Sequence, residues 1–189
     1  MTIQDDISAF FKDPAIPPNL PGNISILYLL RRDIRYCVTK RIILWPATMA
    51  ILAGIDLLGK FYAGEDKQGN VGQRFTNFVN KYFQPISSDD AQTIYQLRNA
   101  LVHSFGLYSK SVKGTSSKEY YFSLIFPKVG PTLVLQRPEN PDMYRISIAA
   151  LNEKFETAIR DYKQDVENNT KLQNSFSLMY RYYGATYID

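Results

Sequence analysis

An almost continuous apolar run, Ile42 to Leu58, most restricts what this chain can fold into. The run contains Pro46 and Asp56 and is shorter than the roughly 20 residues that a membrane-spanning helix needs, so we expect no membrane contact. A helix from Ala47 to about Tyr62 would be apolar on most of its sides, and other elements must then cover it. This helix is predicted to form the centre of a bundle, in which Asp56 requires a partner if it is buried.

Helical periodicity continues on both sides of this run. Residues 1–22 are expected to form an arm with a short amphipathic helix, Ile3 to Phe11, and a proline-rich connector; the arm either packs on its own domain or reaches a second chain. Residues 23–189 are expected to form a single domain. Its further predicted helices are Asn23 to about Leu44 with Asn23 as the N-cap, Val71 to Tyr82, Ser87 to about Phe105, and a last helix that begins near Ser147. Pro46 would break the first of these or lie in the first turn of the next helix.

Between the last two long helices the pattern changes from helix to strand. Lys110 to Lys118 is predicted to be a polar loop. Three strand-like runs follow, YYFSLIF, TLVLQ and MYRISI, and they define an insertion at about residues 119–148. The expected fold class is therefore mainly α, a helical bundle with a small antiparallel β-sheet inserted between its last two long helices.

The cysteine and histidine content limits the chemistry that the chain can carry. Cys37 is the one cysteine, so no internal disulfide can form, and we expect it to be a small core hydrophobe in a reducing compartment. One histidine and no cysteine pair leave little material for a zinc or iron site, and neither a metal nor a cofactor is expected. The first residues show no secretory signal, which predicts a cytoplasmic location. The net charge of +4 favours anionic partners.

The fourth long helix carries the one concentration of reactive side chains. On a helical wheel of about 100° per residue, Asn99 and His103 lie together on one side, and Arg98 lies at the edge of the core-facing stripe. That stripe comprises Ile94, Leu97, Leu101 and Phe105. The wheel argues against His103 as a core residue, while a role in complementing the negative end of the helix dipole stays open.

The string YQLRNALVHSFGLY resembles the motif of HEPN domains, which are helical nucleotide-binding and ribonuclease modules. In that motif an arginine is followed, after about four to six residues, by a histidine, often with a polar residue directly after the arginine. Arg98 matches the arginine, Asn99 the polar residue and His103 the histidine. The resemblance covers about Ile24 to Phe105 and the last helix, and it implies a HEPN-like bundle.

The resemblance also points to an acidic residue on an earlier helix. HEPN families often place one near the arginine and the histidine, and Asp56 is the candidate here. The alternative is that Asp56 is only a structural partner for Arg98 or for a tyrosine hydroxyl.

These residue types suit the cleavage of RNA. The attacking group, the 2′-hydroxyl, belongs to the substrate, so the protein has to move protons and stabilise charge on the phosphate. Imidazole can act as base or acid near neutral pH, a guanidinium matches phosphate oxygens, and an asparagine amide can orient either group. One chain has a single imidazole, whereas acid–base cleavage works best with two groups. The resemblance implies a homodimer in which two copies of the motif meet across a two-fold axis, and this would supply the second His103.

A basic segment on the first long helix is a candidate for contact with the RNA backbone. The alternative is a solvated face without a ligand. Its cations are Arg31, Arg32, Arg35, Lys40 and Arg41.

The sequence supports two main hypotheses of function and leaves a third open. The first is a metal-independent endoribonuclease of HEPN type, which the resemblance associates with toxins and defence effectors. The second is a non-catalytic, HEPN-like dimeric module that binds a nucleotide, RNA or a protein. The third is a structural protein whose motif rigidifies a dimer interface. The partners expected under the first are RNA, a second copy of the chain, and a protein antitoxin or regulator.

Overall fold

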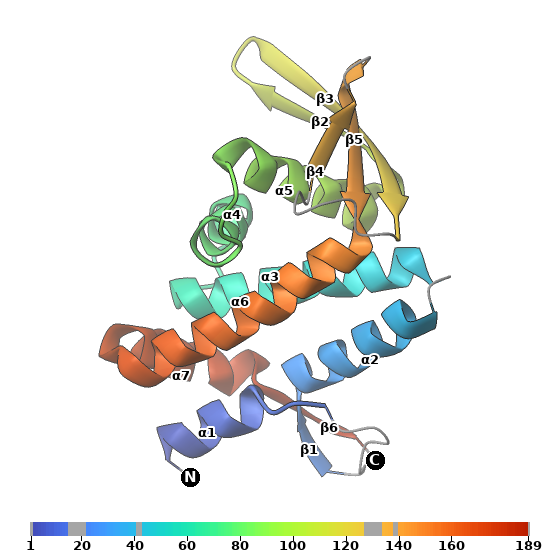
Figure 1. The fold of residues 1–189 in the computed structure, drawn as a ribbon. Helices are drawn as coiled ribbons and strands as arrows, with labels where there is room; N and C mark the ends of the chain where they lie inside the picture. Colours follow the sequence, from blue (N-terminus) through green and yellow to red (C-terminus); the bar gives the residue numbers. More distant parts are fainter. Residues whose placement is uncertain (1, 15–21, 41–42, 127–133, 138–139, 189) are drawn as a thin grey trace.

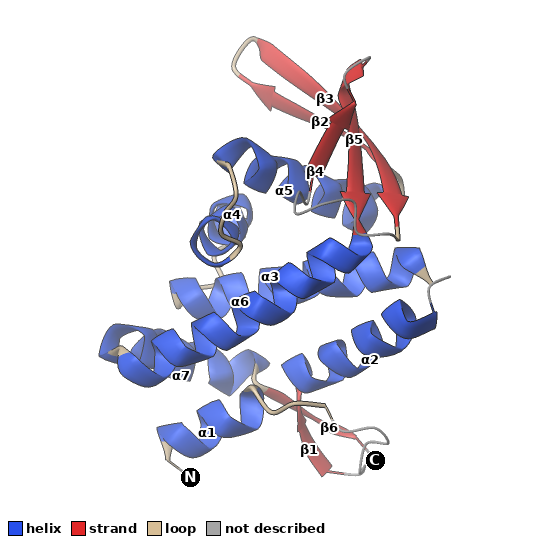
Figure 2. Ribbon diagram, in the orientation of Figure 1, coloured by secondary structure: helices blue, strands red, loops and turns tan. Residues whose placement is uncertain are grey.

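The fold is mainly helical, as the sequence predicts (Figures 1 and 2). It comes from a computed structural model that describes residues 2–14, 22–40, 43–126, 134–137 and 140–188. The helices within these ranges are α1 (Ile3–Phe10), α2 (Ile26–Lys40), α3 (Leu44–Ala63), α4 (Val71–Tyr82), α5 (Ser88–Ser104), α6 (Ile148–Asn168) and α7 (Thr170–Tyr183), with a 3-10 turn at Gln68–Asn70. The strands are β1 (Gly22–Ser25), β2 (Tyr108–Lys113), β3 (Ser116–Ile125), β4 (Val134–Arg137), β5 (Asn140–Ser147) and β6 (Ala185–Ile188).

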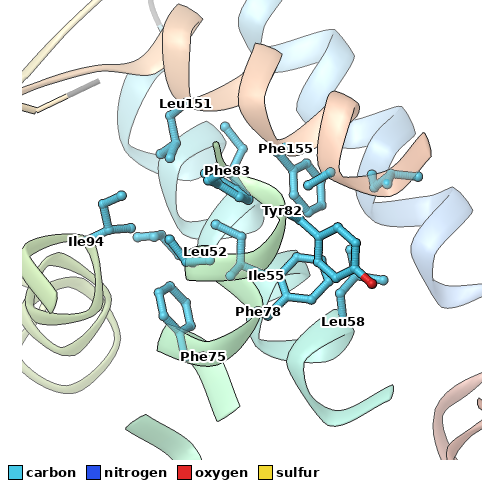
Figure 3. Packing of buried hydrophobic residues seen from close by; sticks show 14 of the residues in the cluster. Leu52, Ile55, Leu58, Phe75, Phe78, Tyr82, Phe83, Ile94, Leu151 and Phe155 are labelled. Atoms are coloured by element: carbon cyan, nitrogen blue, oxygen red, sulfur yellow. The ribbon is translucent and has the colours of Figure 1, made fainter. Parts of the chain in front are cut away.

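Helix α3 forms the centre of the bundle, as its apolar composition requires. It contacts α2, α4, α5, α6 and α7, and Pro46 lies in its first turn, where a missing N–H costs no hydrogen bond. By length and composition alone α3 would suffice to cross a membrane, but half of its most apolar stretch is buried inside this fold. Figure 3 shows its packing against α4, α5 and α6; the labelled residues are Leu52, Ile55, Leu58, Phe75, Phe78, Tyr82, Phe83, Ile94, Leu151 and Phe155.

A glycine allows α6 to approach α3 closely. A Cβ atom at Gly54 would lie 2.4 Å from the ring of Phe155, which is closer than two carbon atoms can pack. Phe155 is fully buried against this bare stretch of α3. The last long helix therefore crosses the central helix at a point that only glycine permits.

The N-terminal arm packs on its own domain. In α1, Ile7 and Phe10 are fully buried, and the ring of Phe10 stacks on Phe61 of α3 with centroids 4.5 Å apart. Ser25 joins α1 to the start of α2. Its hydroxyl donates to the carbonyl of Phe10 at 2.9 Å and accepts from the N–H of Tyr28 at 3.2 Å. Of the two arrangements that the sequence left open, the structure has the arm folded onto its own chain.

Ser25, rather than the predicted Asn23, caps the first long helix. Asn23 lies in β1, which pairs antiparallel with β6 at the C-terminal end of the chain. This pairing joins segments that are far apart in the sequence, so local sequence patterns could not predict it. The β1–β6 pair lies beside α1 and α2 (Figure 1). Thr170–Tyr183, to which the sequence pattern assigned no element, forms α7.

The insertion forms a four-stranded sheet between α5 and α6, in the order β2-β3-β5-β4. The pairs β2–β3 and β4–β5 are antiparallel, and β3 runs parallel to β5. Ser147 ends β5 and is also the N-cap of α6, since its hydroxyl accepts from the N–H of Ala150. The sheet projects from one end of the bundle, above α5 (Figure 2).

The prediction of a polar loop at Lys110 to Lys118 is wrong. These residues form β2 and the start of β3, which pair across a two-residue turn between Lys113 and Ser116. Gly114 in this turn has a φ of 58°, a left-handed conformation that such turns favour. Because the hairpin is made mostly of exposed or half-buried polar residues, no apolar alternation marks its strands.

One carboxylate joins three helices at the other end of the bundle. Asp66, in the loop after α3, lies 3.1 Å from Lys60 of α3 and 3.1 Å from the buried Arg74 of α4, and it accepts a hydrogen bond from the hydroxyl of Tyr183 in α7. Burial acts to raise the pKa of Asp66. The hydrogen bonds from Tyr183 and Lys60 and the charges of Lys60 and Arg74 outweigh it and hold this pKa below its usual range.

We expect Asp66→Asn to destabilise the protein at neutral pH by about 1–2 kcal/mol, because it leaves the buried Arg74 without its anion. The folded-state pKa of Asp66 is lowered, so its stabilising effect is complete above the unfolded value of about 3.9 and is lost as the pH falls through the folded value. Urea unfolding at several pH values should show the gap between wild type and variant closing below about pH 4. Asp161→Asn, at an exposed site, is the control. A gap that stays constant down to acid pH would contradict this account.

Candidate functional site

Helix α5 presents the motif much as the helical wheel predicts. It begins at the N-cap Ser87, whose hydroxyl accepts from the N–H of Asp90. The core stripe is confirmed for Ile94, Leu97 and Leu101, which are fully buried. Phe105 is the exception, with 73% of its surface exposed. It ends the helix in a left-handed conformation, with a φ of 45°, and its side chain therefore leaves the stripe.

Arg98 pairs with Asp56 across the α3–α5 contact. Arg98 Nη2 lies 2.8 Å from Asp56 Oδ2, and only 13% and 17% of the two side chains are exposed. The structure thus brings together the two residues that the sequence placed on separate helices. An ion pair this well covered is screened little by water, so it holds the guanidinium in a defined place.

The same guanidinium contacts the motif histidine. Arg98 Nη1 lies 2.8 Å from His103 Nε2 and 3.3 Å from Asn99 Oδ1. Since arginine has no acceptor, its N–H must donate to a lone pair on Nε2. This hydrogen bond can form only in the tautomer that carries its ring proton on Nδ1. The side chain of His103 is exposed, whereas that of Asn99 is half-buried.

The ion pair keeps unused hydrogen-bonding capacity. Asp56 Oδ1 and Arg98 Nε are both buried, and neither finds a hydrogen-bond partner among the described residues. Each buried polar atom left unpaired costs about 1–3 kcal/mol. The structural pair of Arg74 and Asp66 likewise leaves Arg74 Nε without a partner among the described residues, so the unpaired atoms alone do not mark a functional site.

A groove runs beside the motif, between α5 and β2. It has a volume of about 500 Å³, and Asn99 and His103 line it on the helix side. Tyr108, Ser109 and Lys110 are among the residues that line it on the strand side. The hydroxyl of Ser109 donates to the side chain of Gln96 at 2.6 Å, which fastens β2 to α5.

The residues on the strand side of this groove were not predicted from the sequence to belong to the site. These residues fall in or next to the segment that was predicted to be a loop, so nothing connected them to the motif. A hairpin could have been predicted from the turn at Gly114, because the polar residues on its two sides pair with one another in β2 and β3.

The elements that carry the site also carry exposed apolar side chains. Val102 and Phe105 are exposed at the C-terminal end of α5. Val112 of β2 is 65% exposed, next to the hairpin turn. Tyr108 and Tyr121 are partly exposed rings on β2 and β3.

The predicted basic segment on α2 has a different role at Arg31. This residue is only 3% exposed, and its guanidinium binds Glu156 of α6 at 2.6 Å, Asp13 of the arm, and the carbonyls of Phe11 and Lys12. All of its donors are therefore engaged within the fold. The prediction that Arg31 contacts RNA is corrected accordingly: it fastens the N-terminal arm to α2 and α6.

The other members of that segment are dispersed or engaged. Arg35 lies 3.1 Å from Asp13, and Arg32 lies 2.7 Å from Asp33. Lys40 is exposed, with its ammonium over the ring of Tyr36, and Arg41 lies outside the described residues. Helix α2 lies on the opposite side of α3 from α5 (Figure 1). The segment therefore does not extend the motif surface.

Comparison of the chain with protein-family models, with curated proteins and with solved structures gives no match. Among the described residues, no three His, Cys, Asp or Glu side chains are grouped as metal ligands would be. An assignment of function therefore depends on the motif and on the geometry of its residues.

We expect the ring of His103 to carry its proton on Nδ1 above about pH 8, where an imidazole is neutral. The chain has one histidine, so protein labelled with ¹⁵N-histidine gives the ring signals of His103 alone. Nitrogen shifts measured by NMR should assign Nε2 as the acceptor in the wild type. In Arg98→Ala this preference should disappear, whereas Arg32→Ala, on α2, should keep it. A wild-type ring protonated on Nε2 would contradict the contact with Arg98.

Proposed function

We propose that this protein is a metal-independent endoribonuclease of HEPN type, with a composite site at the interface of a homodimer. One observation carries the proposal: the guanidinium of Arg98 bridges the carboxylate of Asp56 and Nε2 of an exposed His103, each at 2.8 Å. This combines a fixed cation, which suits a phosphate, with an imidazole that has a free face toward solvent.

In the proposed reaction Asp56 is a positioning residue. It holds Arg98 through Nη2, which leaves Nη1 as the donor that turns from His103 to an oxygen of the scissile phosphate. Nε2 of His103, released from that hydrogen bond, then accepts the proton of the 2′-hydroxyl. The amide of Asn99, which lines the same groove, orients the phosphate or the ring.

The bonds change in one displacement at phosphorus. The 2′-oxygen forms a bond to the phosphorus atom, and the bond from phosphorus to the 5′-oxygen breaks. The departing oxygen takes a proton from His103 of the other copy, which enters the step as an imidazolium and leaves it neutral, while the first His103 leaves it protonated. The products are a 2′,3′-cyclic phosphate and a 5′-hydroxyl. Arg98 stabilises the negative charge that develops on the phosphate oxygens.

A two-fold dimer supplies the second imidazole that one chain lacks. The exposed Val102 and Phe105 beside His103 support an interface there, since apolar side chains gain stability when a second copy covers them. An endoribonuclease also requires control in its own cell. The proposal therefore includes a protein antitoxin or regulator as a further partner.

We expect His103→Ala to lose RNA cleavage by at least about 100-fold while staying folded and dimeric. An exposed side chain contributes little to stability, so its melting temperature should change by no more than about 2 °C. Arg98→Ala should lose activity and also about 1–3 kcal/mol of stability, because it leaves Asp56 covered without its cation. Cleavage of labelled RNA, thermal unfolding and sedimentation are measured on the same preparations, with Asp161→Asn, at an exposed site of α6 that does not line the groove, as the control.

The outcomes separate the hypotheses of function. A stable His103→Ala protein that cleaves at the wild-type rate would remove the histidine from the mechanism. Wild-type protein that binds RNA without cutting it would favour the non-catalytic binding module. A variant that dissociates or unfolds would favour the structural role for the motif.

A further inference from the structure

The groove beside the motif has one wall that the helical bundle does not provide. Asn99 and His103 come from α5, but Tyr108, Ser109 and Lys110 come from β2 of the inserted sheet. A substrate phosphate held at Arg98 and His103 would therefore have its neighbouring nucleotides against this strand. The chemistry of the strand then decides which substrates fit.

Tyr108 offers an aromatic face on that wall. It is 42% exposed, so part of its ring is open to solvent. Tyr121, its partner in the β2–β3 pairing, lies with its ring centroid 5.0 Å away at an angle of 44°. Tyr121 is itself restrained, because its hydroxyl donates to Glu119 at 3.0 Å. The ring of Tyr108 is thus supported from one side and half-open on the other.

A cation lies on the same wall, two residues further along β2. Lys110 is exposed and lies 3.5 Å from the carboxylate of Glu119. An exposed pair of this kind is worth little, about 0–1 kcal/mol, so a phosphate can compete for the ammonium. An aromatic face next to an exposed cation is the combination with which proteins bind single-stranded nucleic acids.

We propose that β2 selects single-stranded RNA, with Tyr108 stacking on a base next to the scissile phosphate and Lys110 contacting the adjoining phosphate. The inference rests on the proposed ribonuclease function. A base can stack on a side chain only when it has left its own helical stack, so paired RNA is excluded.

The test uses a DNA strand with a single ribonucleotide, which confines cleavage to one bond. Tyr108→Ala should lower kcat/KM about tenfold, whereas Tyr108→Phe and Tyr108→Trp should stay within about twofold of the wild type, because they keep an aromatic face. The same strand annealed to its complement should be cut at least about tenfold more slowly. Tyr182→Ala, at a 71% exposed tyrosine of α7, is the matched control and should leave the rate unchanged.

A second arm identifies the stacked base. An abasic site is placed on either side of the ribonucleotide in turn. At one of the two positions the loss of the base should lower the wild-type kcat/KM by about the same factor as Tyr108→Ala. Combining that substrate with Tyr108→Ala should add little further loss, since both changes remove one contact.

Three results would overturn the inference and leave the ribonuclease proposal standing. They are wild-type kinetics in Tyr108→Ala, fully multiplicative losses in the abasic series, or equal cleavage of the duplex. Dissociation of Tyr108→Ala into monomers would also overturn it, by assigning Tyr108 to the interface between two copies. If the wild type cleaves none of these substrates and no cellular RNA, both proposals fall.

Discussion

Burial of the apolar helix α3 is the constraint on which the rest of the structure depends. Its residues cannot face water on most sides, so α2, α4, α5, α6 and α7 all pack around it. Gly54 makes room for the ring of Phe155, and the stack of Phe10 on Phe61 adds the N-terminal arm. The same constraint creates the site. Asp56 is the one charge inside this helix before its last turn, and covering it requires a cation from a neighbour.

The ion pair between Asp56 and Arg98 therefore links the fold to the proposed site. A partly buried pair contributes little net stability compared with apolar packing, but it places the guanidinium accurately. Arg98 then holds the ring of His103 at 2.8 Å while that ring stays exposed.

The sequence predicted the parts of the fold that depend on local periodicity. The stripes of α3, α4 and α5 have the helical period, and the N-caps Ser87 and Ser147 are local signals. Features that join distant segments were missed or misread. Asn23 pairs with the C-terminal strand instead of capping a helix, and Arg31 binds Glu156, which is 125 residues away. The β2 wall of the groove was not predicted because its strand is mostly polar apart from Tyr108 and Val112, and it lacks the buried apolar alternation that marks most strands.

In the proposed reaction the substrate supplies the nucleophile, His103 transfers the protons, and Arg98 stabilises the charge on the phosphate. The most direct measurement is the chemistry of the RNA ends that purified protein leaves in an excess of chelator. The account predicts undiminished cleavage with 2′,3′-cyclic phosphate and 5′-hydroxyl ends, because attack by the 2′-oxygen needs no metal-bound water. Cleavage that stops with chelator and returns with magnesium, or that leaves 5′-phosphate ends, would contradict it.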